Sequence, residues 1–209
     1  MSSDCLKTTK TPVFADFSAD YPENEESRIQ KLLSYRILDT APETAYDDLT
    51  ALAAYICGTA ASLVSLIDVS KQWIKSKVGL EITETPRNIA FCAHAILNQG
   101  VMIVPDTHRD DRFVDNLLVT GAPYIRFYAG APLITSDGYA LGTLCVVDYE
   151  PKQLDEAQIR ALEVLSRQVV SHLELRLSVL RIQQETAEKE KAQVALQQIR
   201  LFRNSRGGH

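Results

Sequence analysis

The sequence of 209 residues predicts an α+β fold, in which helices flank an antiparallel β-sheet and one long helix follows it. Two pairs of consecutive apolar segments are separated by short turns, which is typical of β-hairpins, and hairpins build antiparallel sheets. Segments with helical periodicity precede, separate and follow these pairs. The hydrophobic content of 45% is typical of a globular domain.

The chain begins with residues 1–22, which are polar and show no periodicity, so we expect a flexible N-terminal arm. A helix is predicted over residues 23–35, where apolar residues share one face and acidic residues occupy the first turn. Pro42 opens a second predicted helix. This helix runs to Cys57 and ends at Gly58, because glycine often follows the last turn of a helix.

The first predicted hairpin comes next. Residues 61–69 are almost all apolar or small, which indicates a central strand covered on both faces. Residues 72–78 alternate around Trp73, and the turn between the two segments is short. Pro86 then lies near the start of a helix predicted over residues 89–97, because proline suits a first helical turn.

The second part of the sheet is predicted from short apolar segments bounded by turn residues. Pro132 must lie where its strand needs no backbone donor. The elements in order are a strand over residues 101–104, a charged loop over 106–115, a short helix over 114–119 ended by Gly121, a strand over 126–134, a turn over 136–138 and a strand over 139–148.

The chain ends in one long predicted helix, from about residue 154 to residue 201, without Pro or Gly to interrupt it. An apolar residue recurs every seven positions, which is typical of helices that pair along a seam. The residues of this seam are Leu173, Leu180, Ala187, Val194 and Leu201, with Leu177 beside Leu173. Gln184, Lys191 and Gln198 occupy the alternate positions, so we expect a weak parallel or antiparallel coiled coil that forms a homodimer; an exposed linker helix is the alternative.

Charge and composition exclude several classes of function. The net charge of -5 argues against nucleic-acid binding, which needs a basic face. No apolar run is long enough to cross a membrane, and residues 1–21 lack the apolar stretch of a signal peptide, so we expect a cytoplasmic protein that does not bind membranes. The sequence contains neither a Gly-rich dinucleotide motif nor a P-loop. Its four cysteines form no C-x-x-C pair, which favours reduced, buried thiols.

Four segments follow one another in a characteristic order: residues 88–96 (NIAFCAHAI), residues 103–106 (IVPD) followed by 111–113 (DRF), residues 126–133 (RFYAGAPL), and residues 138–148 with LGTLCVVD. Together they resemble GAF domains of bacterial signalling proteins. Residues 168–176 resemble the exit helix of GAF modules that precede histidine kinases or nucleotide cyclases. The resemblance covers residues 23–176.

The resemblance implies a six-stranded antiparallel sheet, a small-molecule pocket on one face of it, and dimerisation through the terminal helices. We therefore divide the chain into an arm (1–22), a GAF domain (23–172) and a coiled-coil signalling helix with its tail (173–209). The expected function is that of a sensory module without catalytic activity of its own, which signals to an output domain such as a histidine kinase or a diguanylate cyclase. The ligand and any cofactor remain unassigned, because one fold hosts many ligands.

Polar and aromatic residues of the resembling segments are the candidate ligand-binding residues. Arg126 lies between two tyrosines and would suit an anionic ligand, or it pairs with Asp106 or Asp111. The charged residues from Asp106 to Arg112 form either a lid over the pocket or local ion pairs. The full set is Trp73, Phe91, Cys92, His94, Asp106, Tyr124, Arg126 and Tyr128.

Two alternatives compete with the sensory function. Free methionine sulfoxide reductases are GAF enzymes, so Cys92 could serve a thiol reductase acting on a small oxidised sulfur compound; the other cysteines of that pattern are missing. On a helix Cys92 and His94 point in different directions, which argues against a catalytic dyad. The second alternative is a ligand-free GAF domain that only dimerises.

Cofactor signatures of the family are not found in the sequence. Residues 114–125 contain no cysteine that could attach a bilin, and the cyclic-nucleotide signature is absent. The chemistry allows His94 to ligate haem, but one histidine is the only feature of the sequence that supports this. Cys57 and Cys145 lie on apolar elements, so we expect them to be inert.

Overall fold

The structure, a computed structural model, describes the backbone of residues 18–206 and the side chains of residues 18–198. Most of the predicted N-terminal arm therefore lies outside the described residues. The elements are α1 (Glu25–Ser34), α2 (Thr44–Cys57), β1 (Ala61–Ile67), β2 (Lys71–Val78), β3 (Glu84–Pro86), η1 (Arg87–Ile89), α3 (Phe91–Ala95), β4 (Met102–Val104), η2 (Thr107–Arg109), α4 (Leu117–Thr120), β5 (Phe127–Ile134), β6 (Ala140–Asp148) and α5 (Glu156–Arg206).

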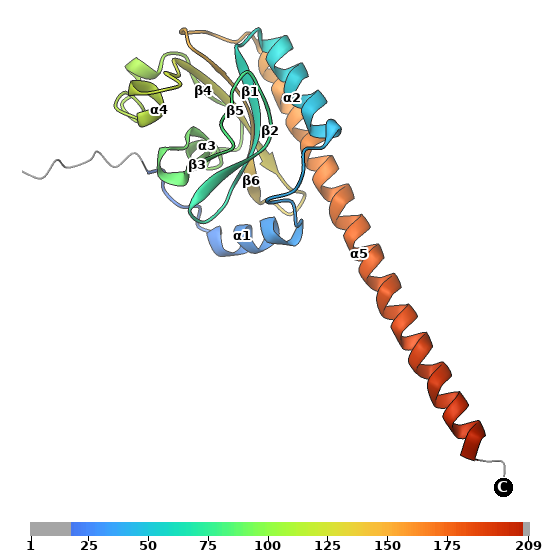
Figure 1. Cartoon of the computed structure of the whole chain (residues 1–209). Helices are drawn as coiled ribbons and strands as arrows, with labels where there is room; N and C mark the ends of the chain where they lie inside the picture. Colours follow the sequence, from blue (N-terminus) through green and yellow to red (C-terminus); the bar gives the residue numbers. More distant parts are fainter. Residues whose placement is uncertain (1–17, 207–209) are drawn as a thin grey trace, which may run out of the picture.

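The six strands form one antiparallel sheet in the order β3-β2-β1-β6-β5-β4 (Figure 1), which confirms the predicted fold class. α2 and the first part of α5 cover one face of the sheet, while η1, α3 and α4 cover the other. We call the face under α2 and α5 the helical face and the face under α3 the α3 face. Each face packs its own hydrophobic cluster, which we call the helical-face cluster and the α3-face cluster. β1 is buried along its whole length because both faces are covered, as its apolar run predicts.

Local sequence signals explain where several elements end. Gly58 terminates α2 in a left-handed conformation with φ of 59°, as predicted. Asn116 caps α4, because its side chain accepts a hydrogen bond from the amide of Leu118. The register of β5 and β6 shifts between Pro132 and Ile134, so the proline lies at an irregularity of the ladder.

The segment around Pro86 differs from its prediction. β3 was not expected there, yet Pro86 is accommodated because β3 is an edge strand of the sheet. The helix predicted over residues 89–97 is divided in two, since Ala90 is extended, with φ of -78° and ψ of 121°. The α-helical part is only the five residues of α3.

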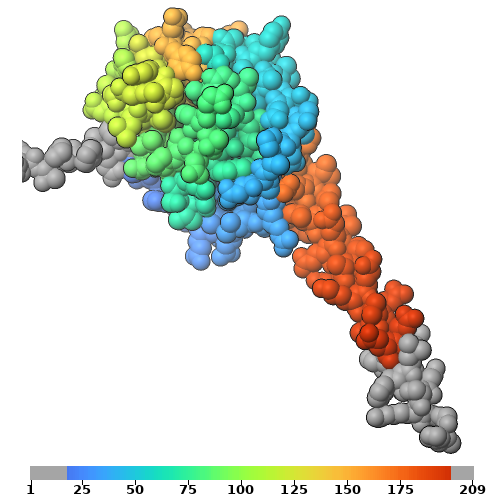
Figure 2. Space-filling view, in the orientation of Figure 1, coloured from blue at the N-terminus to red at the C-terminus, as the bar shows by residue number. Residues whose placement is uncertain are grey.

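α5 begins in the domain core and extends beyond the domain. Leu162, Leu165, Val169, Leu173 and Leu177 are buried in the helical-face cluster, whereas every residue from 181 to 198 is exposed. Figures 1 and 2 show this distal part of α5 projecting away from the domain. Leu173 and Leu177, which the sequence assigned to a dimer seam, are therefore already packed within the chain.

Polar contacts hold α5 to the segment after α1. The hydroxyl of Tyr35 donates to the carboxylate of Glu174 at 2.6 Å. The guanidinium of Arg176 donates to the carbonyl oxygens of Tyr35 and Arg36 at 3.0 and 2.8 Å. It also lies 3.3 Å from the carboxylate of Glu43. These contacts fix the direction in which α5 leaves the domain.

A second polar network anchors α1 to the sheet. Glu25 pairs with both Arg28 and Arg87, whose guanidinium groups donate to the carbonyl oxygens of Ile67 and Asp68 at the end of β1. Burial by itself would raise the pKa of Glu25, but the two arginines outweigh it and lower the pKa to about 2.

Among the described residues, no helix is long and apolar enough to cross a membrane.

We predict that Gly142→Ala destabilises the domain, because β1 and β6 approach each other too closely there for a side chain. A Cβ atom at Gly142 would lie 1.9 Å from the carbonyl oxygen of Ser65 and 2.8 Å from the Cα of Leu66. Urea denaturation should show a loss of about 1–3 kcal/mol in the free energy of unfolding.

Gly100→Ala is the matched control, since a Cβ atom there would meet no atom within 4 Å. Its free energy of unfolding should change by no more than about 0.5 kcal/mol. Equal stability of the two variants would show that β1 and β6 are not this close.

Candidate functional site

An aromatic cluster lies between α3 and the sheet. The rings of Phe91 and Phe113 stack with centroids 4.2 Å apart, and Tyr128 of β5 lies 5.2 Å from Phe91 on stacked planes. His94 packs its ring edge-on against Phe113 at 4.9 Å. Phe91, Phe113 and Tyr128 are almost fully buried. Ring contacts therefore link the loop before α4 to α3 and α3 to the sheet.

A cavity of about 30 Å³ lies beside this cluster, between β2, β3, α3 and β6. It is lined by Leu63, Gln72, Ile74, Leu80, Ile82, Thr85, Phe91, Cys92, Leu118, Ile125, Tyr128, Cys145 and Val147. Pockets for drug-sized ligands measure about 300–1,000 Å³. The cavity has room for a molecule of about the size of water, because about 10–15 Å³ suffices for one.

Two polar atoms in the lining of this cavity have unmet hydrogen-bonding capacity. The side-chain oxygens of Gln72 and Thr85 are buried and have no hydrogen-bond partner within the part of the chain that the structure describes. Buried polar atoms without a partner are uncommon and costly. The cavity therefore combines an apolar wall with two oxygens that can bind a small polar molecule.

Two thiols line the same cavity. The Sγ atoms of Cys92 and Cys145 are 3.7 Å apart, and the hydroxyl of Tyr128 donates to Cys92 Sγ at 3.4 Å. Burial opposes ionisation of Cys92, but hydrogen bonds from Cys145, Ser65, Thr143 and Tyr128 outweigh it and lower the pKa of Cys92. The pKa of Cys145 is raised well above its ordinary value, because its thiol shares a hydrogen bond with Cys92 and is buried.

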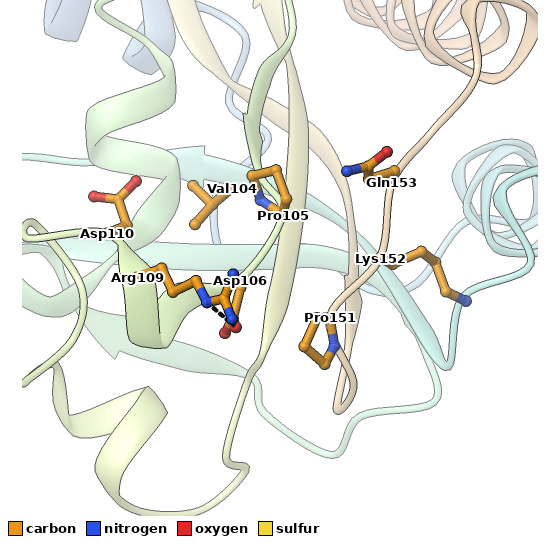
Figure 3. Close-up of a pocket in the computed structure, with 8 residues that line it drawn as sticks. All are labelled: Val104, Pro105, Asp106, Arg109, Asp110, Pro151, Lys152 and Gln153. Atoms are coloured by element: carbon orange, nitrogen blue, oxygen red, sulfur yellow. Dashed lines mark ion pairs between the residues drawn. The ribbon is translucent and has the colours of Figure 1, made fainter.

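A separate hollow of about 550 Å³ lies on the surface, where the chain after β4 meets the chain after β6 (Figure 3). Arg109 reaches across to Asp106, with 3.6 Å between the charged atoms, while Lys152 points away from it. Lys152 instead pairs with Asp148 at 2.8 Å.

Local ion pairs account for most of the charge at this hollow. Arg126 donates to Asp106 at 2.9 Å, and Arg112 donates to Asp110 at 2.6 Å. Burial alone would raise the pKa of Asp106, but Arg126 and the His108 amide hold it below its ordinary value. The arginines and carboxylates thus neutralise each other, which corresponds to the local pairing that the sequence left open as an alternative to a lid.

The predicted ligand-binding residues do not form a single site. Phe91, Cys92 and Tyr128 come together at the cavity, with His94 at the outer edge of the cluster. Asp106 and Arg126 pair with each other at the surface hollow, and Tyr124 is 60% exposed.

Trp73 packs in the helical-face cluster, because the alternation of β2 turns its neighbours Gln72 and Ile74 toward α3. The structure therefore gives no support to Trp73 as part of this site.

Sequence reasoning missed four residues of the cavity region: Gln72, Thr85, Phe113 and Cys145. Alternation along β6 could have placed Cys145 on the α3 face, since side chains two apart share a face. Thr85 gave no such signal, because β3 was not predicted. Phe113 lies in a loop, where periodicity gives no information about direction.

A GAF domain family model matches residues 41–173, so the chain belongs to the GAF family. Over 154 residues the chain is 42% identical to a cyclic di-GMP phosphodiesterase of Pseudomonas aeruginosa. The match covers 73% of this chain but 26% of that relative, so the chain corresponds to about a quarter of the longer protein.

Solved structures show the same fold at low sequence identity. The chromophore-binding domain of a bacteriophytochrome from R. palustris is 13% identical with a TM-score of 0.55, covering 76% of this chain and 64% of that one. The GAF domain of a phosphoenolpyruvate-protein phosphotransferase from Acinetobacter is 12% identical with a TM-score of 0.54, covering 75% and 96%. Free methionine-R-sulfoxide reductase from Neisseria meningitidis is 16% identical with a TM-score of 0.53, covering 78% and 99%. At these identities the likeness concerns the fold alone.

We predict that Phe113→Ala strongly destabilises the domain, because the ring is fully buried and contacts both Phe91 and His94. The expected loss is about 3–5 kcal/mol in the free energy of unfolding by chemical denaturation. Val114→Ala is the control, since Val114 is 37% exposed and should cost less than about 1 kcal/mol. A similar, small loss in both variants would show that the aromatic cluster does not hold the α3 face together.

Proposed function

We propose that this chain is a sensory module that binds a small molecule on the α3 face, dimerises through α5, and transmits a ligand-dependent change to an output domain. Membership of the GAF family supports the sensory function. The observation that carries the proposal is the division of α5 into a buried part and an exposed part.

α5 is suited to transmission because one continuous helix contains both parts. It has 51 residues, which corresponds to a length of about 77 Å. The first half of α5 packs on strands whose opposite face carries the aromatic cluster. β5 shows this, because it contributes Phe127 and Ala129 to the helical-face cluster and Tyr128 to the α3-face cluster. A displacement of β5 would therefore change the packing of the first part of α5.

Ligand binding on the α3 face requires a change in the covering elements. The cavity of about 30 Å³ is too small for a drug-sized ligand. α3 and α4 have only five and four residues, and the rings of Phe91 and Phe113 fill the space between them and the sheet. A ligand would stabilise an arrangement in which these short elements have moved outward, and its differential affinity sets the size of the population shift.

The dimer would form along exposed apolar residues of α5. Val164, Leu175, Val179 and Ile182 are exposed and share one face, which is opposite to Leu173 and Leu177. This stripe continues into a mostly apolar groove of about 650 Å³ that is lined by residues of α2 and α5. The predicted seam can contribute its exposed members, Ala187 and Val194, whereas Leu201 lies outside the described side chains.

We place the proposed GAF domain at residues 23–172 and the signalling helix at residues 173–209, as the sequence suggested. The core contacts of α5 extend beyond this boundary to Leu177.

For the output domain, the relative from Pseudomonas aeruginosa favours an enzyme of cyclic di-GMP turnover over the histidine kinase expected first from the sequence. The reductase alternative is disfavoured, since residues 101–143 contain none of the further cysteines of the reductase pattern.

We predict that the chain sediments as a dimer and that Ile182→Glu weakens this dimer, because a glutamate in the stripe formed by Val164, Leu175, Val179 and Ile182 would be desolvated without a partner. The dissociation constant measured by sedimentation velocity should rise at least about tenfold, which corresponds to about 1.4 kcal/mol. Val194→Glu tests the heptad seam in the same way, so the pair of variants identifies which face is used.

Ala192→Glu is the matched control, since Ala192 is exposed on a face of α5 that contains neither set. Its dissociation constant should remain that of the unmodified chain, and circular dichroism should confirm that all three variants are folded. A monomer at all concentrations, or a dimer that neither Ile182→Glu nor Val194→Glu weakens, would contradict dimerisation through α5.

A further inference from the structure

Two cysteines from different elements meet in the interior of the domain. Cys92 lies on α3 and Cys145 lies on β6, and their Sγ atoms are 3.7 Å apart. Both residues are buried, at 2% and 0% exposure. The proposed sensory function uses neither thiol, and the sequence predicted that Cys145 is inert. Their contact therefore needs a separate explanation.

The cavity brings a small reactant within reach of both sulfur atoms. Cys92 and Cys145 both line it, and its volume of about 30 Å³ has room for a molecule of about the size of water. Gln72 and Thr85 also line it, and the side-chain oxygen of each is buried without a partner among the described residues. These two oxygens can accept hydrogen bonds from a small hydroxylic molecule, and the Thr85 hydroxyl can also donate one.

We propose that Cys92 and Cys145 are a modification site, at which a peroxide of the size of hydrogen peroxide converts the two thiols into a reversible disulfide that links α3 to β6. The proposal rests on the contact of the two sulfur atoms and on the cavity beside them. It does not depend on the sensory function or on dimerisation, so the two sets of experiments can fail separately.

The chemistry needs no reactant other than the peroxide. The Cys92 thiolate attacks one peroxide oxygen, the O–O bond breaks, and the products are a sulfenic acid on Cys92 and, after protonation, one water. The Cys145 sulfur then attacks the Cys92 sulfur, the S–O bond breaks, and the leaving hydroxide takes the Cys145 proton as a second water. Two electrons pass from the two sulfurs to the peroxide.

The hydrogen bonds around the pair favour Cys92 as the first sulfur to react. Cys145 on β6 and Tyr128 on β5 are the titratable groups that contact it, and each can donate to Cys92 Sγ. These donors stabilise the thiolate of Cys92, while Cys145 keeps its proton until the second step. Closing the disulfide requires the sulfurs to approach from 3.7 Å to about 2.05 Å.

Cys57 provides an internal control within the same chain. It is also buried, at 3% exposure, but it lies on α2 in the other hydrophobic cluster. Burial raises the pKa of Cys57 to about 11, against a smaller lowering by Lys152. An oxidant that reaches thiols only through unfolding would modify Cys57 as readily as Cys92.

The test treats the reduced full chain with hydrogen peroxide under native conditions, blocks free thiols with an alkylating agent at set times, and maps the peptides by mass spectrometry without reduction. We expect a cross-linked peptide pair containing Cys92 and Cys145, which disappears after dithiothreitol, while Cys57 stays alkylated. Cys145→Ser should abolish the cross-link and leave a sulfenic acid on Cys92 that dimedone captures. Cys57→Ser should form the cross-link at the original rate.

Tyr128→Phe gives a readout that simple proximity of the thiols would not. Loss of the hydroxyl donor should raise the pKa of Cys92, slow the cross-linking at neutral pH by about tenfold, and move the pH midpoint of the reaction upward. Absence of the Cys92–Cys145 cross-link in the folded chain would overturn the proposal. So would oxidation of Cys57 at the same rate as Cys92, or a cross-linking rate that does not change in Tyr128→Phe.

Discussion

The packing of the first half of α5 against the sheet is the constraint on which the rest of the structure depends. Five apolar side chains of this half, from Leu162 to Leu177, are buried in the helical-face cluster. Burying a leucine or valine side chain contributes about 1.5–3 kcal/mol each. The direction of α5 is then fixed by directional contacts, in which Glu174 accepts from Tyr35 and Arg176 donates to the backbone after α1. Residues 181–198 of the same helix are exposed, and their direction follows from that of the buried part.

The two faces of the sheet differ in what holds them. The helical face is covered by two long helices, α2 and α5, whereas the α3 face is covered by short elements and loops that pack aliphatic side chains, three aromatic rings and two thiols against the sheet. In the part of the chain that the structure describes, the side-chain oxygens of Gln72 and Thr85 on this face are buried without a hydrogen-bond partner. Short helices gain little stability from their own hydrogen bonds and rely on side-chain packing. The α3 face is therefore the part of the domain that can change with the least loss of stability, and the strands connect it to α5.

Much of this fold could be predicted because its signals are local. The two hairpins, Gly58 at the end of α2 and the irregularity at Pro132 follow from chain patterns and turn chemistry. Features that depend on tertiary contacts were missed. β3 is three residues long and pairs with β2 at the edge of the sheet, and the break at Ala90 leaves no mark in the apolar pattern.

The candidate site was predicted only in part, for the same reason. Phe91, Cys92 and Tyr128 do meet, but Trp73 lies on the opposite face, and Cys145 contacts Cys92 although the sequence suggested an inert residue. Leu173 and Leu177 fit a heptad as well as they fit a domain core, since both patterns repeat along one face of a helix. Their burial by the sheet could be learned only from the structure.

Hydrogen exchange along α5, measured by mass spectrometry at protein concentrations below and above that of dimerisation, tests whether this helix connects the domain core to a second copy of the chain. We expect slow exchange of residues 156–177 at both concentrations, because they belong to the core of each chain. We expect fast exchange of residues 181–198 at the low concentration and slow exchange at the high one, because the second copy would cover them. Fast exchange of residues 181–198 at every concentration, or fast exchange of residues 156–177, would contradict the claim that α5 connects the domain core to a partner.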